Sequence, residues 1–137
     1  MSEQDIKNKN AVLIAYLDSI INDYKIKAEY STNKNDTKVI VVQETSGQKE
    51  IFFDANPLYN YYNVDIFSDD IKGAKDTSVE IGNLIGKNII FDWLNNKKTE
   101  KWQILIKQFA NPRTIVYEDI RRVSYTSTLQ CIVNRIA

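Results

Sequence analysis

Near the end of the chain stands the segment RRVSYTSTLQCIVNR, residues 121–135, in which apolar and polar side chains alternate. One face would carry Val123, Tyr125, Leu129, Cys131 and Val133, and the other would carry Ser124, Thr126, Thr128, Gln130 and Asn134. A period of two is the pattern of a strand with one face on the core and the other toward water. The segment therefore predicts a long strand of an antiparallel sheet.

Several segments upstream have a similar extended character. Residues 39–42 are β-branched, and with the apolar residues 51–53 beyond a turn they predict a hairpin. Residues 59–67 and 101–109 alternate as strands do, and residues 25–30 are a candidate edge strand. These segments would supply the neighbours of the strand at 121–135.

Two other segments have helical spacing. Between residues 5 and 24 the apolar side chains recur at helical intervals, at Ile6, Leu13, Leu17, Ile20 and Tyr24. Between residues 77 and 94 an apolar side chain returns every fourth position, at Ile81, Ile85, Ile89 and Trp93, with Gly82 and Gly86 allowing close approach to a sheet. This order of elements predicts one α+β domain over residues 1–137, with a single, mostly antiparallel sheet and two helices packed on it.

The composition disfavours several classes of function. The 18 basic residues are balanced by 18 acidic ones, whereas binding to duplex nucleic acid requires an excess of positive charge. The chain has no His and a single Cys, Cys131, so we expect no metal site, no cofactor and no catalytic nucleophile. The glycines match no phosphate-binding loop, and no apolar run is long enough for a membrane helix or a secretory signal.

Three small clusters have a functional and a structural interpretation, and in each we favour the structural one. The carboxylates Asp65, Asp69 and Asp70 suit a divalent cation, but capping and loop solvation also account for them. Tyr59, Tyr61 and Tyr62 suit stacking on bases, but tyrosines in a strand usually pack on the core with their hydroxyls at its rim. Lys97, Lys98 and Lys101 form a basic group that would offset the dipole at the end of the second helix.

A charged segment, Glu118-Asp119-Ile120-Arg121-Arg122, stands at the start of the last strand. One interpretation is a salt bridge within the chain. The other is a subunit interface, in which Glu118 and Asp119 of one copy meet Arg121 and Arg122 of the next. No partner residue for acid–base catalysis accompanies this segment.

The order of elements, with the segments NVDIFSDD, SVEIGNLIGKNIIFDWL and YEDIRRVSYTSTLQCIVNRI, resembles the tail terminator family of long-tailed bacteriophages, some of whose members are known as phage minor capsid proteins. The similarity is greatest near the end, at Tyr117, Asp119, Arg121 and Val123 and along the strand to Ile136. In that family a sheet flanked by helices is typical.

The resemblance implies a structural protein of the virion, made in the bacterial host cytoplasm and placed at the head-proximal end of the tail. It implies a homo-oligomer, a hexameric ring that caps the tail tube and joins it to head connector or neck proteins, with the tail sheath as a further candidate partner. No membrane and no sequence-specific nucleic acid is implied. Residues 118–122 would lie at a subunit contact, and loops 31–38 and 46–60 would face the tube or connector.

Two rival functions stay open. A head-completion or adaptor protein of the neck would occupy the connector side of the same virion. A small module that binds nucleic acid or a host factor is the other, whereas an enzyme is the class that the composition favours least.

Overall fold

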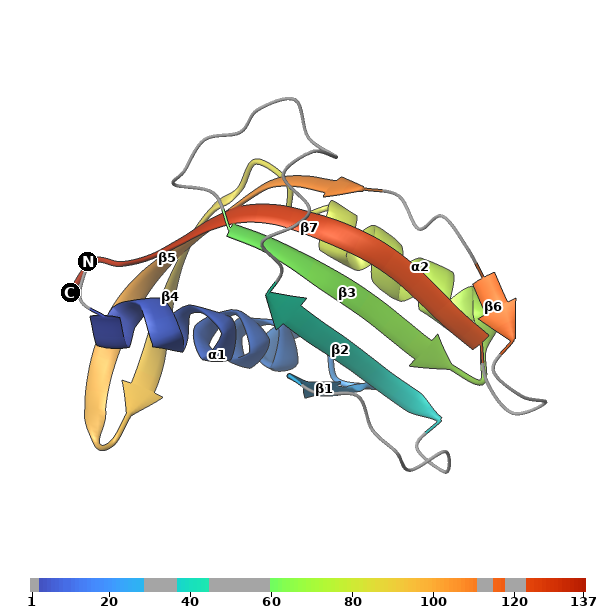
Figure 1. Cartoon of the computed structure of the whole chain (residues 1–137), viewed down its shortest axis with the longest axis horizontal. Helices are drawn as coiled ribbons and strands as arrows, with labels where there is room; N and C mark the ends of the chain where they lie inside the picture. The colour runs from blue at the N-terminus through green and yellow to red at the C-terminus, as the bar shows by residue number, and fades with distance from the viewer. Residues whose placement is uncertain (1–2, 29–36, 45–59, 111–114, 118–122) are drawn as a thin grey trace.

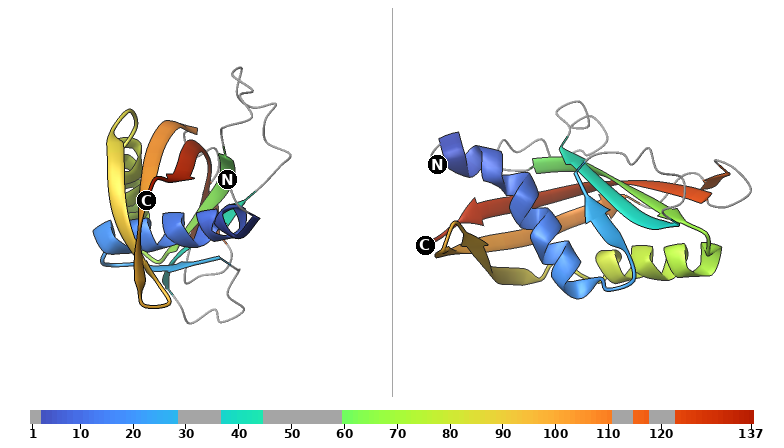
Figure 2. Two further views of the ribbon diagram at one scale, coloured as in Figure 1. Left: turned by 90° about the vertical axis from the view of Figure 1, so that its left-hand side faces the viewer. Right: turned by 90° about the horizontal axis from the view of Figure 1, so that it is seen from below.

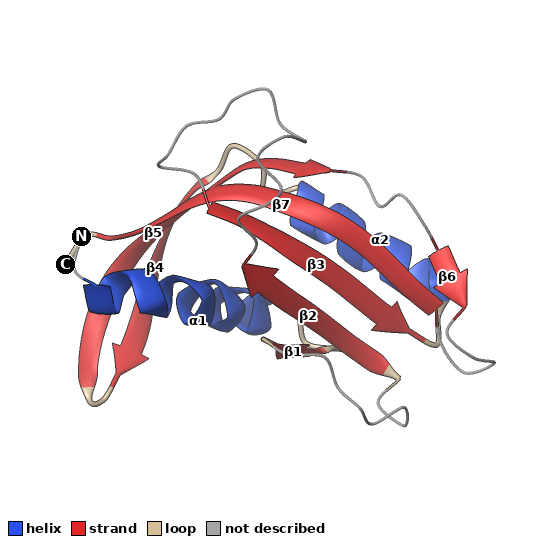
Figure 3. Cartoon of the chain, in the orientation of Figure 1, coloured by secondary structure: helices blue, strands red, loops and turns tan. Residues whose placement is uncertain are grey.

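The computed structural model describes residues 3–28, 37–44, 60–110, 115–117 and 123–137. Within this part of the chain, two helices and the strands of one sheet are present (Figures 1 and 3). In chain order they are α1 (Glu3–Ile20), β1 (Lys25–Lys27), β2 (Lys38–Glu44), β3 (Asn60–Ser68), α2 (Ile71–Gly82), β4 (Asn88–Asn95), β5 (Lys98–Ala110), β6 (Ile115–Tyr117) and β7 (Val123–Arg135). The predicted α+β class with a single sheet is confirmed.

The strand predicted from residues 121–135 is the centre of the sheet. The strand order is β1-β2-β3-β7-β5-β4, and β6 pairs with the start of β7. One edge of β7 pairs with β3 and the other with β5 and β6, all antiparallel. The short β1 runs parallel to β2, so the sheet is mixed but mostly antiparallel.

Both helices lie on the same side of the curved sheet (Figure 2). They share one core with the strands, in which α1 contributes Val12, Leu13 and Leu17, and α2 contributes Ala74 and Ile81. The facing side chains of the sheet are fully buried and include Ile40, Val64, Ile66, Trp102, Ile104, Ile106, Leu129 and Val133. Each such side chain contributes about 1.5–3 kcal/mol by leaving water. The predicted packing of two helices on the sheet is therefore confirmed.

The other face of the sheet is less polar at its centre than the alternation predicts. Val39, Val41 and Phe67 form a second buried cluster there. Gln130 is fully buried and Thr128 is 8% exposed, although both were expected to face water. A central strand has neighbours along both edges, and their side chains cover its own.

The first helix ends four residues earlier than predicted. It ends at Ile20, which is itself 39% exposed, so the apolar stripe does not continue to Tyr24 as a helix. Tyr24 is nevertheless buried, because the chain turns back toward β1 and the Tyr24 hydroxyl hydrogen-bonds the Ser68 hydroxyl at 3.1 Å. The predicted edge strand at 25–30 is present in shorter form as β1.

The predicted helix at 77–94 is wrong beyond Gly82. The helix α2 starts earlier, at Ile71, and ends at Gly82, and residues 88–95 form β4. Gly86 lies between them with φ +82°, and its N–H donates to the Ile106 carbonyl at 2.9 Å. This backbone geometry favours glycine and starts the strand pairing. A Cβ on Gly82 would meet nothing within 4 Å, so close approach to the sheet does not explain that glycine.

The predicted hairpin of residues 39–42 with 51–53 is only half described. The first half is β2, and its described antiparallel partner is β3, which matches the predicted strand at 59–67. Residues 51–53 lie outside the described part of the chain, as do Asn111 and Pro112, which were expected to end the strand that is β5. No helix in the described part is long and apolar enough to cross a membrane.

Candidate functional site

The hairpin of β4 and β5 projects from the body of the molecule beyond α1 (Figure 1). Its turn residues Asn96 and Lys97 have φ angles of +48° and +72°, which is typical of a tight two-residue hairpin turn. The prediction that Lys97, Lys98 and Lys101 follow a helix is therefore wrong, because the residues before them form β4. These lysines have no helix dipole to offset, and they give the end of the hairpin a positive charge.

Only one of these lysines is neutralised within the described residues. Lys101 lies 3.5 Å from the Asp92 carboxylate across the β4–β5 pair. Lys97 and Lys98 are exposed and take part in no ion pair with another described residue. We call Leu94 to Lys98 the hairpin tip, a surface that combines two lysines with a leucine side chain that is 68% exposed.

A buried carboxylate fixes the base of the hairpin. Glu100 is 7% exposed, and it accepts hydrogen bonds from Trp102 Nε1 at 3.1 Å and Asn95 Nδ2 at 3.3 Å. The Arg135 guanidinium of β7 lies 3.7 Å from the same carboxylate. Trp93 of β4 packs edge-on against Trp102 with ring centroids 6.3 Å apart. The tip is therefore presented by a hairpin whose base is held rigidly to the sheet.

The strand β4 forms one outer edge of the sheet in the described structure. Its side chains toward the helices are half-buried, and Phe91 packs edge-on against Tyr16 of α1 with centroids 5.6 Å apart. Its opposite face is exposed, with Ile90 at 52% and Leu94 at 68%. A long edge strand with exposed apolar side chains is a site where another chain can bind.

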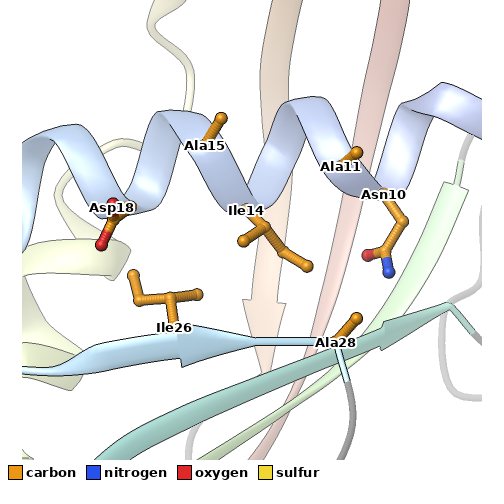
Figure 4. Close-up of a pocket in the computed structure, with 7 residues that line it drawn as sticks. All are labelled: Asn10, Ala11, Ile14, Ala15, Asp18, Ile26 and Ala28. Atoms are coloured by element: carbon orange, nitrogen blue, oxygen red, sulfur yellow. The ribbon is translucent and has the colours of Figure 1, made fainter.

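At the opposite edge of the sheet, a groove of about 450 Å³ runs between α1 and β1 (Figure 4). It is mostly apolar and is lined by Asn10, Ala11, Ile14, Ala15, Asp18, Ile26 and Ala28. Figure 4 shows Asp18 toward one end and Asn10 toward the other, with the small side chains of Ala11 and Ala15 between them. We call this the α1–β1 groove.

One end of the α1–β1 groove carries an exposed carboxylate that suits a cation or an N–H donor. At the other end, the Asn10 Oδ1 atom is buried and has no hydrogen-bond partner among the described residues. Asp18 is exposed in the last turn of α1, which holds no basic residue. A carboxylate at that position is disfavoured by the partial negative charge of the helix end. Sequence reasoning missed this groove, although the spacing of Ala11, Ala15 and Asp18 on one helix face was a usable signal.

The residues predicted to form the subunit interface, Glu118, Asp119, Arg121 and Arg122, lie outside the described residues. The three predicted carboxylates are not brought together into one cluster: Asp65 is buried within β3, and Asp69 and Asp70 are exposed beyond its end. No group of three potential metal ligands occurs in the described part of the chain. Asp70 precedes α2 as its N-cap residue, but its side chain makes no capping hydrogen bond.

The tyrosines of β3 pack into the protein instead of forming a stacking surface. Tyr61 is 2% exposed and Tyr62 is fully buried, whereas Tyr59 lies outside the described residues. Gln130 Nε2 donates to the Tyr61 hydroxyl at 3.4 Å on one face. The Tyr62 hydroxyl, on the other face, is buried without a partner among the described residues, so the expectation that these hydroxyls reach the rim is wrong for Tyr62.

Cys131 occupies the apolar face of β7, as its place in the alternation predicts, and it is fully buried. Burial raises the pKa of the Cys131 thiol well above its usual range, with smaller effects from Lys9 and Glu44. Burial likewise raises the pKa of Tyr62. A thiol that keeps its proton in an apolar environment is a poor nucleophile.

Comparison with known proteins shows the fold and no more. Neither a protein-family model nor a curated protein matches the chain. Six solved chains match, and one of them, whose name indicates no function, superposes with a TM-score of 0.51 at 12% sequence identity. The superposition covers 100% of this chain and 99% of that one, so the whole fold has a known counterpart.

Proposed function

We propose that the protein is a structural component of a bacteriophage virion, a tail terminator that forms a ring, closes the tail tube and joins it to the head connector. The segments NVDIFSDD, SVEIGNLIGKNIIFDWL and YEDIRRVSYTSTLQCIVNRI support this family. The described elements of the chain form one sheet with both helices on one side, which agrees with the fold that the resemblance implies.

The observation that carries the proposal is the exposed edge of β4. Soluble proteins usually protect an edge strand with charges, a bulge or a covering segment, because it can pair with other chains. Here β4 is eight residues long, is outermost in the described sheet and exposes Ile90 and Leu94 on the side away from the helices. A protein that works by joining copies and neighbours would use such an edge.

The location of the protein tests the proposal directly. In particles of the phage that carries the gene, gold-labelled antibody should mark the junction between tail and head in electron micrographs. Deletion of the gene should leave heads and tails that do not join. Complete, infective particles formed without the protein would rule the proposal out, and label on the connector side alone would favour the neck adaptor.

Substitution on the β4 edge should separate assembly from folding. We expect the double variant Ile90→Lys/Leu94→Lys to lose incorporation into particles, because charges on the edge oppose contact with another chain. Its stability should change by less than about 1 kcal/mol, since both side chains are mostly exposed. The matched control is Val79→Lys, where the side chain is 60% exposed and belongs to α2 instead of β4. Equal incorporation of the edge variant and the control would contradict a role for β4.

A further inference from the structure

We propose that the hairpin tip of one copy docks into the α1–β1 groove of the next, with Lys97 and Lys98 directed toward Asp18. The inference rests on the proposed function in one respect, which is that the partner is a second copy of this chain. It adds to that function the two surfaces that meet and the side chains that make the contact.

The two surfaces are complementary in chemistry. The tip offers the exposed Leu94 side chain and two lysines that take part in no ion pair with a described residue. The groove offers an apolar floor from Ala11, Ile14, Ala15 and Ile26, with a carboxylate at one end. A lysine has a long apolar stem and a charged head, so its stem suits the floor while its ammonium group reaches the carboxylate.

The end of α1 adds to the attraction for a cation. Asp18 stands in its last turn without a basic neighbour in that turn, and Asp23 follows a few residues later, also exposed. The C-terminal end of a helix carries partial negative charge, which adds to the charge of these carboxylates.

The positions of the two surfaces determine the kind of assembly. The tip extends from β4 and the groove lies against β1, and these strands are the opposite edges of the sheet. A contact between two different surfaces is heterologous, so a pair of joined copies keeps one free groove on the first copy and one free tip on the second for further copies. Contacts of this kind build rings when the rotation between copies closes.

Disulfide trapping tests the contact in the purified full-length protein. A Lys98→Cys protein is mixed at high concentration with an Ala15→Cys protein and mildly oxidised, and the cross-linked dimer is measured. The matched control replaces Ala15→Cys by Glu80→Cys, an exposed position on α2 that does not line the groove. The native Cys131 is fully buried and does not compete. We expect several-fold more dimer with Ala15→Cys, and equal yields would overturn the proposal.

Charge reversal distinguishes the specific contact from chance collision. Adding Asp18→Lys to the groove protein, or Lys97→Glu to the tip protein, should lower the yield to that of the control. Combining both reversals should restore it, because the pair is again opposite in charge. Asp18→Lys places a cation in the last turn of α1, so circular dichroism should show an intact fold. A dimer yield that is unchanged by either charge reversal would overturn the proposal.

The two proposals fail separately. If the cross-link is selective but the protein is absent from the tail, the contact is supported and the terminator function is rejected. If the protein is found at the tail junction but cross-linking is unselective, the terminator function is supported and this contact is rejected.

Discussion

The central strand β7 and the edge strand β4 belong to one sheet but differ in what surrounds them. β7 has paired neighbours along both edges, and Leu129, Cys131 and Val133 are fully buried. β4 has one described neighbour, and its outward side chains Ile90 and Leu94 are more than half exposed. The same residue types therefore stabilise the fold in one strand and remain available for binding in the other.

Removing a leucine from each strand should give the largest contrast. Leu129→Ala in β7 is expected to lower the free energy of unfolding by about 2–5 kcal/mol, because it leaves a cavity in the core. Leu94→Ala in β4 should change it by no more than about 0.5 kcal/mol, since the side chain is 68% exposed. Urea unfolding of the two variants measures both, and similar losses would contradict the distinction between the strands.

Alkaline pH should lower the stability of the protein through two buried groups at the centre of the sheet, Cys131 and Tyr62. Burial raises the pKa of Cys131 above its usual 9.0 and that of Tyr62 above 10.0, so the unfolded chain loses these protons before the folded one does. The contribution of Cys131 to stability is complete below pH 9 and falls above it, and that of Tyr62 is complete below pH 10 and falls above it, in each case by about 1.4 kcal/mol per pH unit.

One variant tests whether the Cys131 thiol contributes to the loss of stability at alkaline pH. Urea midpoints between pH 7 and pH 10 should fall less steeply above pH 9 for Cys131→Ala than for the natural protein. The quantity compared is the slope of the urea midpoint against pH. The cavity left by the substitution lowers the midpoint at every pH and does not change this slope. Parallel curves would show that the thiol does not contribute.

The smallest expected effect lies in the turn of the β4–β5 hairpin. Lys97 has φ +72°, where glycine is favoured over other residues, so Lys97→Gly should stabilise the protein by about 0.5–1 kcal/mol. The thermal midpoint should rise slightly. The same variant should weaken incorporation into particles if Lys97 contacts Asp18 of a neighbouring copy. A lower midpoint would show that the turn geometry is not strained at this position.

The two strands also differ in how well the sequence predicts them. Residues 123–135 alternate strictly enough to identify β7 as a strand before its neighbours are known. Residues 88–95 read NIIFDWLN, in which both faces carry apolar side chains, so a strand period and a helix period both fit. The series Ile81, Ile85, Ile89 and Trp93 therefore predicted a helix across Gly86, where the chain in fact turns.

The candidate site was partly visible in the sequence. Lys97, Lys98 and Lys101 were identified as a basic cluster, but their role was misread because it depended on the element before them. The groove was not predicted, since its lining comes from two segments that only packing brings together. The charged residues 118–122, on which the predicted interface depended, lie outside the described structure, and their role stays a prediction.

Local periodicity by itself determined the α+β class, the first helix and the strands β2, β3, β5 and β7, because each of these buries one face or both at a regular spacing. Tertiary structure alone decided which strand is central, which edges face outward and that a basic tip and an apolar groove ending in a carboxylate lie at opposite edges of the sheet. The physical reason is that burial and strand pairing depend on residues distant in the chain, and local sequence patterns do not identify those residues.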